Sequence, residues 1–215
     1  VCSAASTGRT VEVGLEIPAV ERASIEPFLA SEGGSSDIEA LTASEFWTRE
    51  YQDGRSSQAM LDLLGRLREL RTAGLPVDVF PFDLDPSQDS ADRDKGMADN
   101  IATHVRAHPR TLTMVLTGEV HAWKTRGAPW KAEFLPMGWH IAEAGLPVRS
   151  LGRATPKGAA WICTGATADS CGIRQTGATE PLPSGRTAGV ELLPGPTARG
   201  YAGLYATPGL TASPP

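Results

Sequence analysis

Three short segments of β-forming residues constrain the fold of this chain most strongly, because helical segments separate them. They are residues 11–17 (VEVGLEI), 76–83 (PVDVFPFD) and 111–116 (TLTMVL). Alternation and β-branched or aromatic side chains predict a strand in each, and the third is expected to be buried. Strands that alternate with helices favour a largely parallel sheet covered by helices on both faces. The predicted fold class is therefore three-layer α/β.

The segments between these strands carry helical periodicity. Apolar residues recur at core-facing spacing in 57–72, and the following Gly74 and Pro76 are typical of a helix end. A second helix is expected before residue 108, capped by Ser90. Its apolar stripe consists of Met97, Ile101 and Val105, and the stripe of the first helix consists of Met60, Leu63, Leu64, Leu67 and Leu70.

Composition restricts the partners that this chain can have. Its 215 residues suffice for one α/β domain, or for a domain with an extension. The net charge of −5 and the lack of a basic stripe argue against nucleic acid. No apolar run approaches the roughly 18 to 20 residues of a membrane span. We expect a small-molecule or peptide substrate, and the oligomeric state stays open.

The composition changes near residue 165. We expect residues 1–165 to form the α/β domain and residues 166–215 to form a Gly/Pro-rich extension packed on it. Within that extension, 176–199 is predicted to be a long loop and 201–207 a final edge strand. Cys163 and Cys171 lie close together with small residues between them. They form either a disulfide in an oxidising compartment or two unrelated thiols, and they lack the second ligand pair of a zinc site.

Polar side chains end each of the three predicted strands. Glu16 ends the first strand, Asp83 ends the second, and Gly118-Glu119-Val120-His121 follows the third. The carboxyl ends of parallel strands meet at one edge of a sheet, where ligands bind. We therefore expect these side chains to converge. Alternatively, Glu16 is exposed on an edge strand and His121 is an ordinary loop residue.

Arg93 occupies the first turn of the helix that follows the second strand, and so begins at the same edge. The helix dipole disfavours a cation there, which indicates a neighbouring acid or anionic ligand; the alternative is a frayed first turn with Arg93 in water. His104 and His108 lie four residues apart at the far end of this helix. They could bind one metal ion, but cations are favoured in a last turn in any case. We favour the latter interpretation for this pair.

Four segments resemble the erythromycin-esterase/ChaN-like group, also called the TIKI superfamily. They are GLEIP (14–18), FWTREYQDGRSSQAM (46–60), RDKGMADNI (93–101) and GEVHAWK (118–124). The resemblance implies an α/β sheet with helices on both faces. The known roles of the group are macrolide ester hydrolysis, metal-dependent proteolysis and haem binding in iron uptake. A shared fold therefore does not identify the reaction.

The resemblance also implies roles for single residues. His121 matches the histidine of the second Gly-x-x-His motif of the family, and Glu16 matches the glutamate at the end of its second strand. Arg93 and Asp94 lie where this subgroup keeps an Arg-Asp pair. The first Gly-x-x-His motif has no counterpart here. We therefore expect a chain truncated at its N-terminus that lacks the first strand.

The predicted function is that of a hydrolase for an ester or amide bond, with a divalent metal ion as a possible cofactor. Glu16 and His121 are the candidate bases or metal ligands, and Arg93 would stabilise an oxyanion. Further ligand-binding candidates are Asp83, Asp94, Glu119, Trp123 and Arg55. The alternatives are a ChaN-type protein that binds haem or another iron-linked ligand through His121, and a degenerate, non-catalytic domain. A periplasmic or secreted location is expected.

Overall fold

A three-stranded parallel sheet forms the centre of the molecule. The structure, a computed structural model, describes residues 1–85, 92–154, 157–165, 167–177, 179 and 181–215. The strands are β1 (Val11–Pro18), β2 (Val77–Asp83) and β3 (Leu112–Leu116), in the order β2-β1-β3. In the register of the sheet, Val11 pairs with Val77 on one side and with Leu112 on the other. The prediction of a parallel α/β sheet is confirmed.

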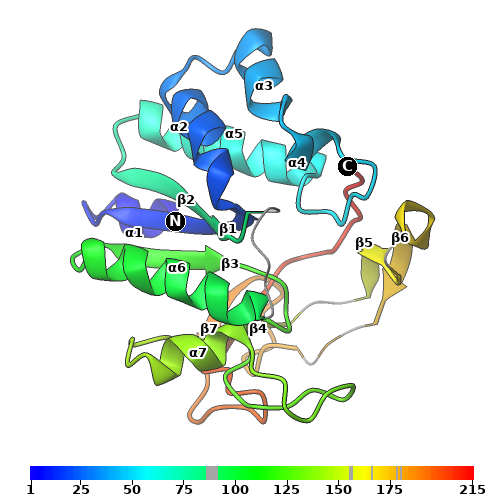
Figure 1. The fold of residues 1–215 in the computed structure, drawn as a ribbon. Coiled ribbons are helices and arrows are strands. Elements are labelled where there is room, and N and C mark those ends of the chain that lie inside the picture. The colour runs from blue at the N-terminus through cyan, green and yellow to red at the C-terminus, as the bar shows by residue number, and fades with distance from the viewer. Residues whose placement is uncertain (86–91, 155–156, 166, 178, 180) are drawn as a thin grey trace.

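Helices cover both faces of this sheet (Figure 1). The helices α2 (Arg22–Ala30), α3 (Ser35–Thr42) and α5 (Gln58–Thr72) lie on one side, and α6 (Arg93–Ala107) and α7 (Met137–Glu143) lie on the other. The short helical segments are α1 (Cys2–Ala5), η1 (Ala19–Glu21), α4 (Glu45–Thr48) and η2 (Ala168–Ser170). The three-layer arrangement is as expected from the alternation of strands and helices.

Two apolar clusters hold the layers together, one on each face. The first contains Val13 and Val79 from the sheet together with leucines of α5. The second contains Phe80 and Phe82 together with Met97 of α6 and residues of α7. Alternate residues of β2 thus serve opposite faces, as the pleat of a strand requires. The predicted stripes of α5 and α6 lie in or against these clusters.

The starts and edges of some elements differ from the sequence-based expectation. The expected cap Ser90 lies outside the described residues; the side chain of Asp92 caps α6 by accepting from the Lys95 amide at 3.1 Å. The strand β3 was expected to be buried, yet Met114 is 41% and Leu116 47% exposed. The reason is that β3 lies at the edge of the described sheet.

None of the described helices combines the length and apolarity needed to cross a membrane.

The C-terminal part contains more β-structure than expected. A second sheet has the order β4-β8-β7, from β4 (Leu151–Arg153), β7 (Gly189–Leu192) and β8 (Gly203–Ala206). The prediction of one loop across 176–199 was wrong because β7 lies within it, and β8 is the middle strand instead of an edge. A hairpin of β5 (Gly158–Cys163) and β6 (Cys171–Thr176) stands apart from both sheets (Figure 1).

The extension contacts the α/β part at several points. Tyr201 donates its hydroxyl proton to the Glu119 carbonyl at 3.2 Å, and the Ala59 amide donates to the Ser213 hydroxyl at 2.9 Å. Cys163 and Cys171 face each other across the β5–β6 hairpin and form a disulfide, so the disulfide alternative is confirmed. The boundary at residue 165 stays a prediction.

Candidate active site

The ends of the three central strands meet at Glu16. This side chain is only 8% exposed. Its Oε2 accepts a hydrogen bond from the Gly118 amide at 2.9 Å and another from the Thr117 hydroxyl at 2.7 Å, so the chain just after β3 holds the end of β1. Burial opposes the charged form of Glu16, yet the electrostatic effect of the neighbouring His121 and these hydrogen bonds hold its pKa below the ordinary value. Glu16 is therefore an ionised carboxylate.

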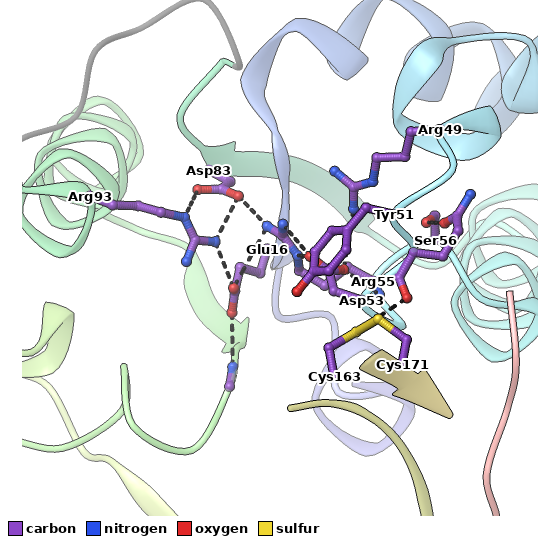
Figure 2. Close-up of polar contacts among 12 residues, drawn as sticks. Glu16, Arg49, Tyr51, Asp53, Arg55, Ser56, Asp83, Arg93, Cys163 and Cys171 are labelled. Carbon is purple, nitrogen blue, oxygen red and sulfur yellow. Dashed lines mark hydrogen bonds and ion pairs between the residues drawn. A yellow bond between two sulfur atoms is a disulfide. The ribbon is translucent and has the colours of Figure 1, made fainter. Parts of the chain in front are cut away.

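Arg93, the first residue of α6, joins Glu16 to Asp83. Its Nε donates to Asp83 Oδ1 at 2.9 Å, and its Nη2 donates to Asp83 Oδ2 and to Glu16 Oε1, both at 2.8 Å (Figure 2). Although burial acts in the opposite direction, these two carboxylates raise the pKa of Arg93. Of the two interpretations of Arg93, the structure supports neighbouring acids, which also offset the unfavourable helix dipole.

His121 is oriented by Asp94, the second residue of α6. The Nδ1 atom of His121 lies 2.7 Å from Asp94 Oδ1, which also accepts from the Met137 amide at 2.7 Å. A carboxylate only accepts, so Nδ1 carries a proton; a guanidinium only donates, so Nε2, which faces Arg93, is placed as an acceptor. Nε2 faces the other charged groups, 3.3 Å from Nη1 of Arg93 and 3.9 Å from Glu16 Oε1. A basic nitrogen thus lies beside a guanidinium.

Arg55 enters the site from the loop before α5, held by Asp53. Its Nη2 lies 2.7 Å from Asp53 Oδ2, and its Nη1 contacts Asp83 and lies 3.8 Å from Glu16 Oε1 (Figure 2). Asp53 was not among the predicted site residues. A signal was present in the Asp-Gly-Arg sequence: Asp53 Oδ1 accepts from the Arg55 amide at 3.2 Å, and Gly54 has a φ of 91°, as in a turn that begins at an aspartate.

The disulfide hairpin supports this loop. Trp161 of β5 donates its indole proton to the Gln52 carbonyl at 2.7 Å, and the Tyr51 hydroxyl donates to the Gly165 carbonyl at 3.2 Å. Figure 2 shows the Cys163–Cys171 bond beside the loop that carries Asp53 and Arg55. On the other side of the loop, Phe46 belongs to the first core cluster and Trp47 packs against it. The loop is therefore anchored from both sides.

These side chains surround a small polar cavity of about 270 Å³. A ligand pocket typically measures roughly 300 to 1,000 Å³, so this one suits a small chemical group. A larger hollow of about 400 Å³ lies between α2, α3 and α5; its charged lining residues, Asp62, Arg66, Arg68 and Glu69, all come from the one helix α5, and its described lining includes no histidine. The cavity at the strand ends is lined by Glu16, Asp53, Arg55, Arg93, Gly118 and His121.

Of the five predicted ligand-binding residues, Arg55 lines this cavity. Asp83 and Asp94 contact the lining side chains Arg93 and His121, whereas Glu119 and Trp123 do not line it. Residues 119–122 form a turn, which directs successive side chains to different sides. Glu119 is exposed, whereas Trp123 is buried with the guanidinium of Arg199 3.9 Å above its ring. A strand-like alternation beyond Gly118 would have placed Glu119 and His121 on one side, and the turn separates them.

Glu16 and His121 do not fit a divalent metal ion in this arrangement. The guanidinium of Arg93 contacts both of them, at 2.8 Å from Glu16 Oε1 and 3.3 Å from His121 Nε2. The second guanidinium, of Arg55, lies 3.8 Å from the same Glu16 oxygen. A third cation would face two fixed positive charges. In the described part of the chain, the side chains that could together hold a metal ion are those of Glu12, His104 and His108.

Comparison with known proteins agrees with the fold. No protein-family model matches the chain, and no curated protein matches it. Among solved structures it is similar to an erythromycin esterase mutant, EreC, in its open conformation, with a TM-score of 0.63 and 11% identity over 95% of this chain and 83% of that chain. The fold is therefore erythromycin esterase-like. At this identity the likeness concerns the fold alone, and the activity has to be argued from the site.

Proposed function

We propose that this protein hydrolyses an ester or amide bond of a small molecule in the cavity at the strand ends. The observation that carries the proposal is the Asp94–His121 pair, which presents an unprotonated Nε2 beside two arginines. An imidazole oriented by a buried carboxylate is a suitable general base. Guanidinium donors beside it suit the negative charge that develops on a carbonyl oxygen. The erythromycin esterase-like fold is compatible with this chemistry.

In the proposed reaction, His121 Nε2 takes a proton from a water molecule as that water attacks the carbonyl carbon. The ionised Asp94 stabilises the imidazolium that forms. The carbonyl oxygen becomes an oxyanion, and collapse of the tetrahedral intermediate breaks the bond to the alcohol or amine. His121 then returns its proton to that leaving group. One proton passes from water through His121 to the leaving group, and water supplies the hydroxyl group of the new acid.

In this reaction, Arg93 donates a hydrogen bond to the oxyanion. Its Nε and Nη2 are committed to Asp83 and Glu16, whereas the described contact of Nη1 is a long one of 3.3 Å to His121. A substrate oxygen can accept from Nη1, which then leaves the His121 lone pair to the attacking water. Glu16 and Asp83 accordingly act as positioning residues, because they hold the guanidinium in place. Glu16 is thus assigned a different role from the general base expected from the sequence.

The site offers less support for haem. An axial imidazole needs an accessible nitrogen and an apolar wall, but His121 Nε2 faces Arg93 and charged side chains line most of the cavity. Trp123, one of the predicted ligand-binding residues, is buried beneath Arg199 and does not line the cavity. The Cys163–Cys171 disulfide supports an oxidising compartment such as the periplasm or the extracellular space.

The test is turnover of a panel of small activated esters and amides by the full chain and by His121→Gln and Asp94→Asn. We expect His121→Gln to lower kcat/KM by about a thousandfold, and Asp94→Asn to lower it by about a hundredfold or more. His140→Gln is the matched control, because it removes an imidazole that does not line the cavity. Circular dichroism checks the fold of each variant. Equal turnover by His121→Gln and the unmodified chain on a responsive substrate would refute the proposal.

A further inference from the structure

A second group of ionisable side chains lies at the opposite end of β1. Glu12 is 7% exposed, and one of its carboxylate oxygens lies 2.7 Å from Nε2 of His104. The other oxygen lies 3.7 Å from Nδ1 of His108. The two imidazoles are one helical turn apart on α6, with ring centroids separated by 4.4 Å. One ligand atom from each of the three residues lies within 4.8 Å of the others.

The packing around this group fixes two of its members. His104 stacks on Phe80 with 3.7 Å between ring centroids and an angle of 7°. Phe80 in turn occupies the space above Gly14, where an added Cβ would lie only 2.7 Å from the phenyl ring. The Thr111 hydroxyl, just before β3, lies 3.0 Å from Glu12 Oε2, the same oxygen that contacts His104. The strand, the helix end and the turn therefore hold Glu12 and His104 in one arrangement.

The charge of Glu12 lacks a fixed cation. Within the described residues, no lysine or arginine forms an ion pair with it, and its partners are two imidazoles and a hydroxyl. A buried carboxylate normally has a cationic partner or coordinates a metal ion, because removal from water is costly. Glu16, on the same strand, differs in this respect, because the guanidinium of Arg93 lies 2.8 Å from its carboxylate.

We propose that Glu12, His104 and His108 bind a divalent transition-metal ion, of which Zn²⁺ is the best match. Two imidazoles and a carboxylate are a common zinc ligand set, with bonds of about 2.0 to 2.2 Å and a fourth position for water. Ligand atoms around tetrahedral zinc lie roughly 3.4 Å apart. Binding requires the three ligand atoms, now within 4.8 Å of one another, to move closer, and His108 Nδ1 to leave the His104 carbonyl, which lies 3.0 Å away. The side chain of His108, 45% exposed, has room to turn.

The ion would act as a structural clip. It would join the start of β1 to the last turn of α6, next to the turn that leads into β3. Glu12 and Glu16 are four residues apart on one strand, so this site lies about 13 Å from the candidate active site. The proposal is independent of the proposed hydrolase activity, since it concerns other side chains and its test measures binding.

The test is titration of the full, tag-free chain with Zn²⁺ by calorimetry, together with thermal unfolding with and without the ion. We expect one zinc ion per chain and a higher Tm in its presence. Loss of one direct ligand should weaken binding by roughly a hundredfold or more, since loss of an outer partner alone costs 10- to 100-fold. Both His108→Ala and Glu12→Gln should show this loss.

The controls separate this site from other imidazoles. His108→Ala carries the test if Glu12→Gln fails to fold, because His108 is largely exposed at a helix end. His121→Ala should bind zinc as the unmodified chain does. The proposal is overturned if the unmodified chain binds no zinc, if His108→Ala binds it equally well, or if His121→Ala abolishes binding.

Discussion

Glu12 and Glu16 lie on the same face of one strand, four residues apart, and their surroundings differ in kind. Glu16 receives hydrogen bonds from a guanidinium, an amide and a hydroxyl. Glu12 contacts two imidazoles and a hydroxyl. Both carboxylates are buried to a similar degree, 7% and 8% exposed. Burial alone therefore does not determine what such a group does; its partners decide.

The difference follows from where the two ends lie in the fold. At the carboxyl end of β1, the first residue of α6 and the loop before α5 each supply an arginine. These two guanidinium groups balance the charge of Glu16 without a ligand. At the amino end, α6 finishes, and its last turn supplies His104 and His108 instead. Burial lowers the pKa of His104, which keeps this ring uncharged near neutral pH. The carboxyl end thus suits reaction chemistry, and the amino end suits a cation.

The largest effect on stability is expected from removing the cation at the carboxyl end of β1. Arg93→Met should leave Asp83 and Glu16 without their shared partner and cost about 3 kcal/mol in the free energy of unfolding, a value reduced from the fully buried case by partial exposure of the guanidinium. Turnover should fall by about a hundredfold or more. Chemical denaturation and kinetics measure both effects.

Two further variants sharpen this result. Lys95→Met removes a cation from the same helix at an exposed pair with Asp99, and should change the free energy of unfolding by less than about 0.5 kcal/mol. Arg93→Lys should not restore activity, because a lysine cannot donate to both oxygens of Asp83 in a planar fork. Full activity of Arg93→Lys would show that a point charge suffices.

The next effect concerns the disulfide that supports the loop of Arg55. Replacing Cys163 and Cys171 with serine should cost about 2 to 3 kcal/mol, as for a short closed loop. Turnover should fall severalfold because Arg55 loses its support, whereas zinc binding at Glu12 should not change. Cys2→Ser is the control, since that exposed thiol is free. Unchanged turnover in the double variant would mean that Asp53 alone positions Arg55.

The dependence of stability on pH should distinguish the carboxyl end from an ordinary surface. The pKa of Glu16 is lowered from 4.5, so its stabilising contribution is present above that value and is lost as the pH falls through the lower, folded-state pKa. Glu16→Gln should therefore show a flatter loss of stability than the unmodified chain as the pH falls from about 5 to 3. Exposed Glu26→Gln controls for net charge, and urea denaturation at each pH supplies the measurement. Parallel curves would contradict the assignment.

The part of the site that could be predicted from the sequence is the part fixed by strand topology. Parallel strands bring their carboxyl ends to one edge, which places Glu16 and Asp83 together, and the helix after β2 must begin there with Arg93. The turn after β3 was less predictable. Its hydrogen bonds direct His121 towards Asp94 and leave Glu119 exposed, and no simple periodicity describes a turn.

Contacts between distant segments account for what the sequence could not reveal. The position of Arg55 depends on a loop anchored to a hairpin about a hundred residues later, through Trp161 and Gln52. Glu12 and His104 are 92 residues apart, and their meeting depends on how far α6 extends back along the sheet. The strand β7 was missed because it has only four residues and is largely exposed, with Val190 at 53% and Leu192 at 54%, so its Val-Glu-Leu alternation is too short to indicate a strand.

The smallest effect is expected from removing the threonine hydroxyl that contacts each of the two glutamates. Thr117 Oγ1 lies 2.7 Å from Glu16 Oε2, and Thr111 Oγ1 lies 3.0 Å from Glu12 Oε2. The Thr111 hydroxyl also lies 2.9 Å from the His108 carbonyl, so its single proton is shared between two acceptors. Replacing each threonine with valine preserves shape and removes only the donor.

We expect Thr117→Val to cost about 1.5 kcal/mol, because a hydrogen bond to a charged and buried group is lost outright, and Thr111→Val to cost about 0.5 to 1 kcal/mol. The effects on function should separate further. Thr117→Val should lower turnover slightly and leave zinc affinity unchanged, whereas Thr111→Val should weaken zinc binding by roughly tenfold, as loss of an outer partner does. Urea denaturation and zinc titration of the two variants measure this. If both variants altered turnover and zinc affinity alike, the two ends of β1 would be coupled, and the separation of a reactive end from a metal-binding end would fail.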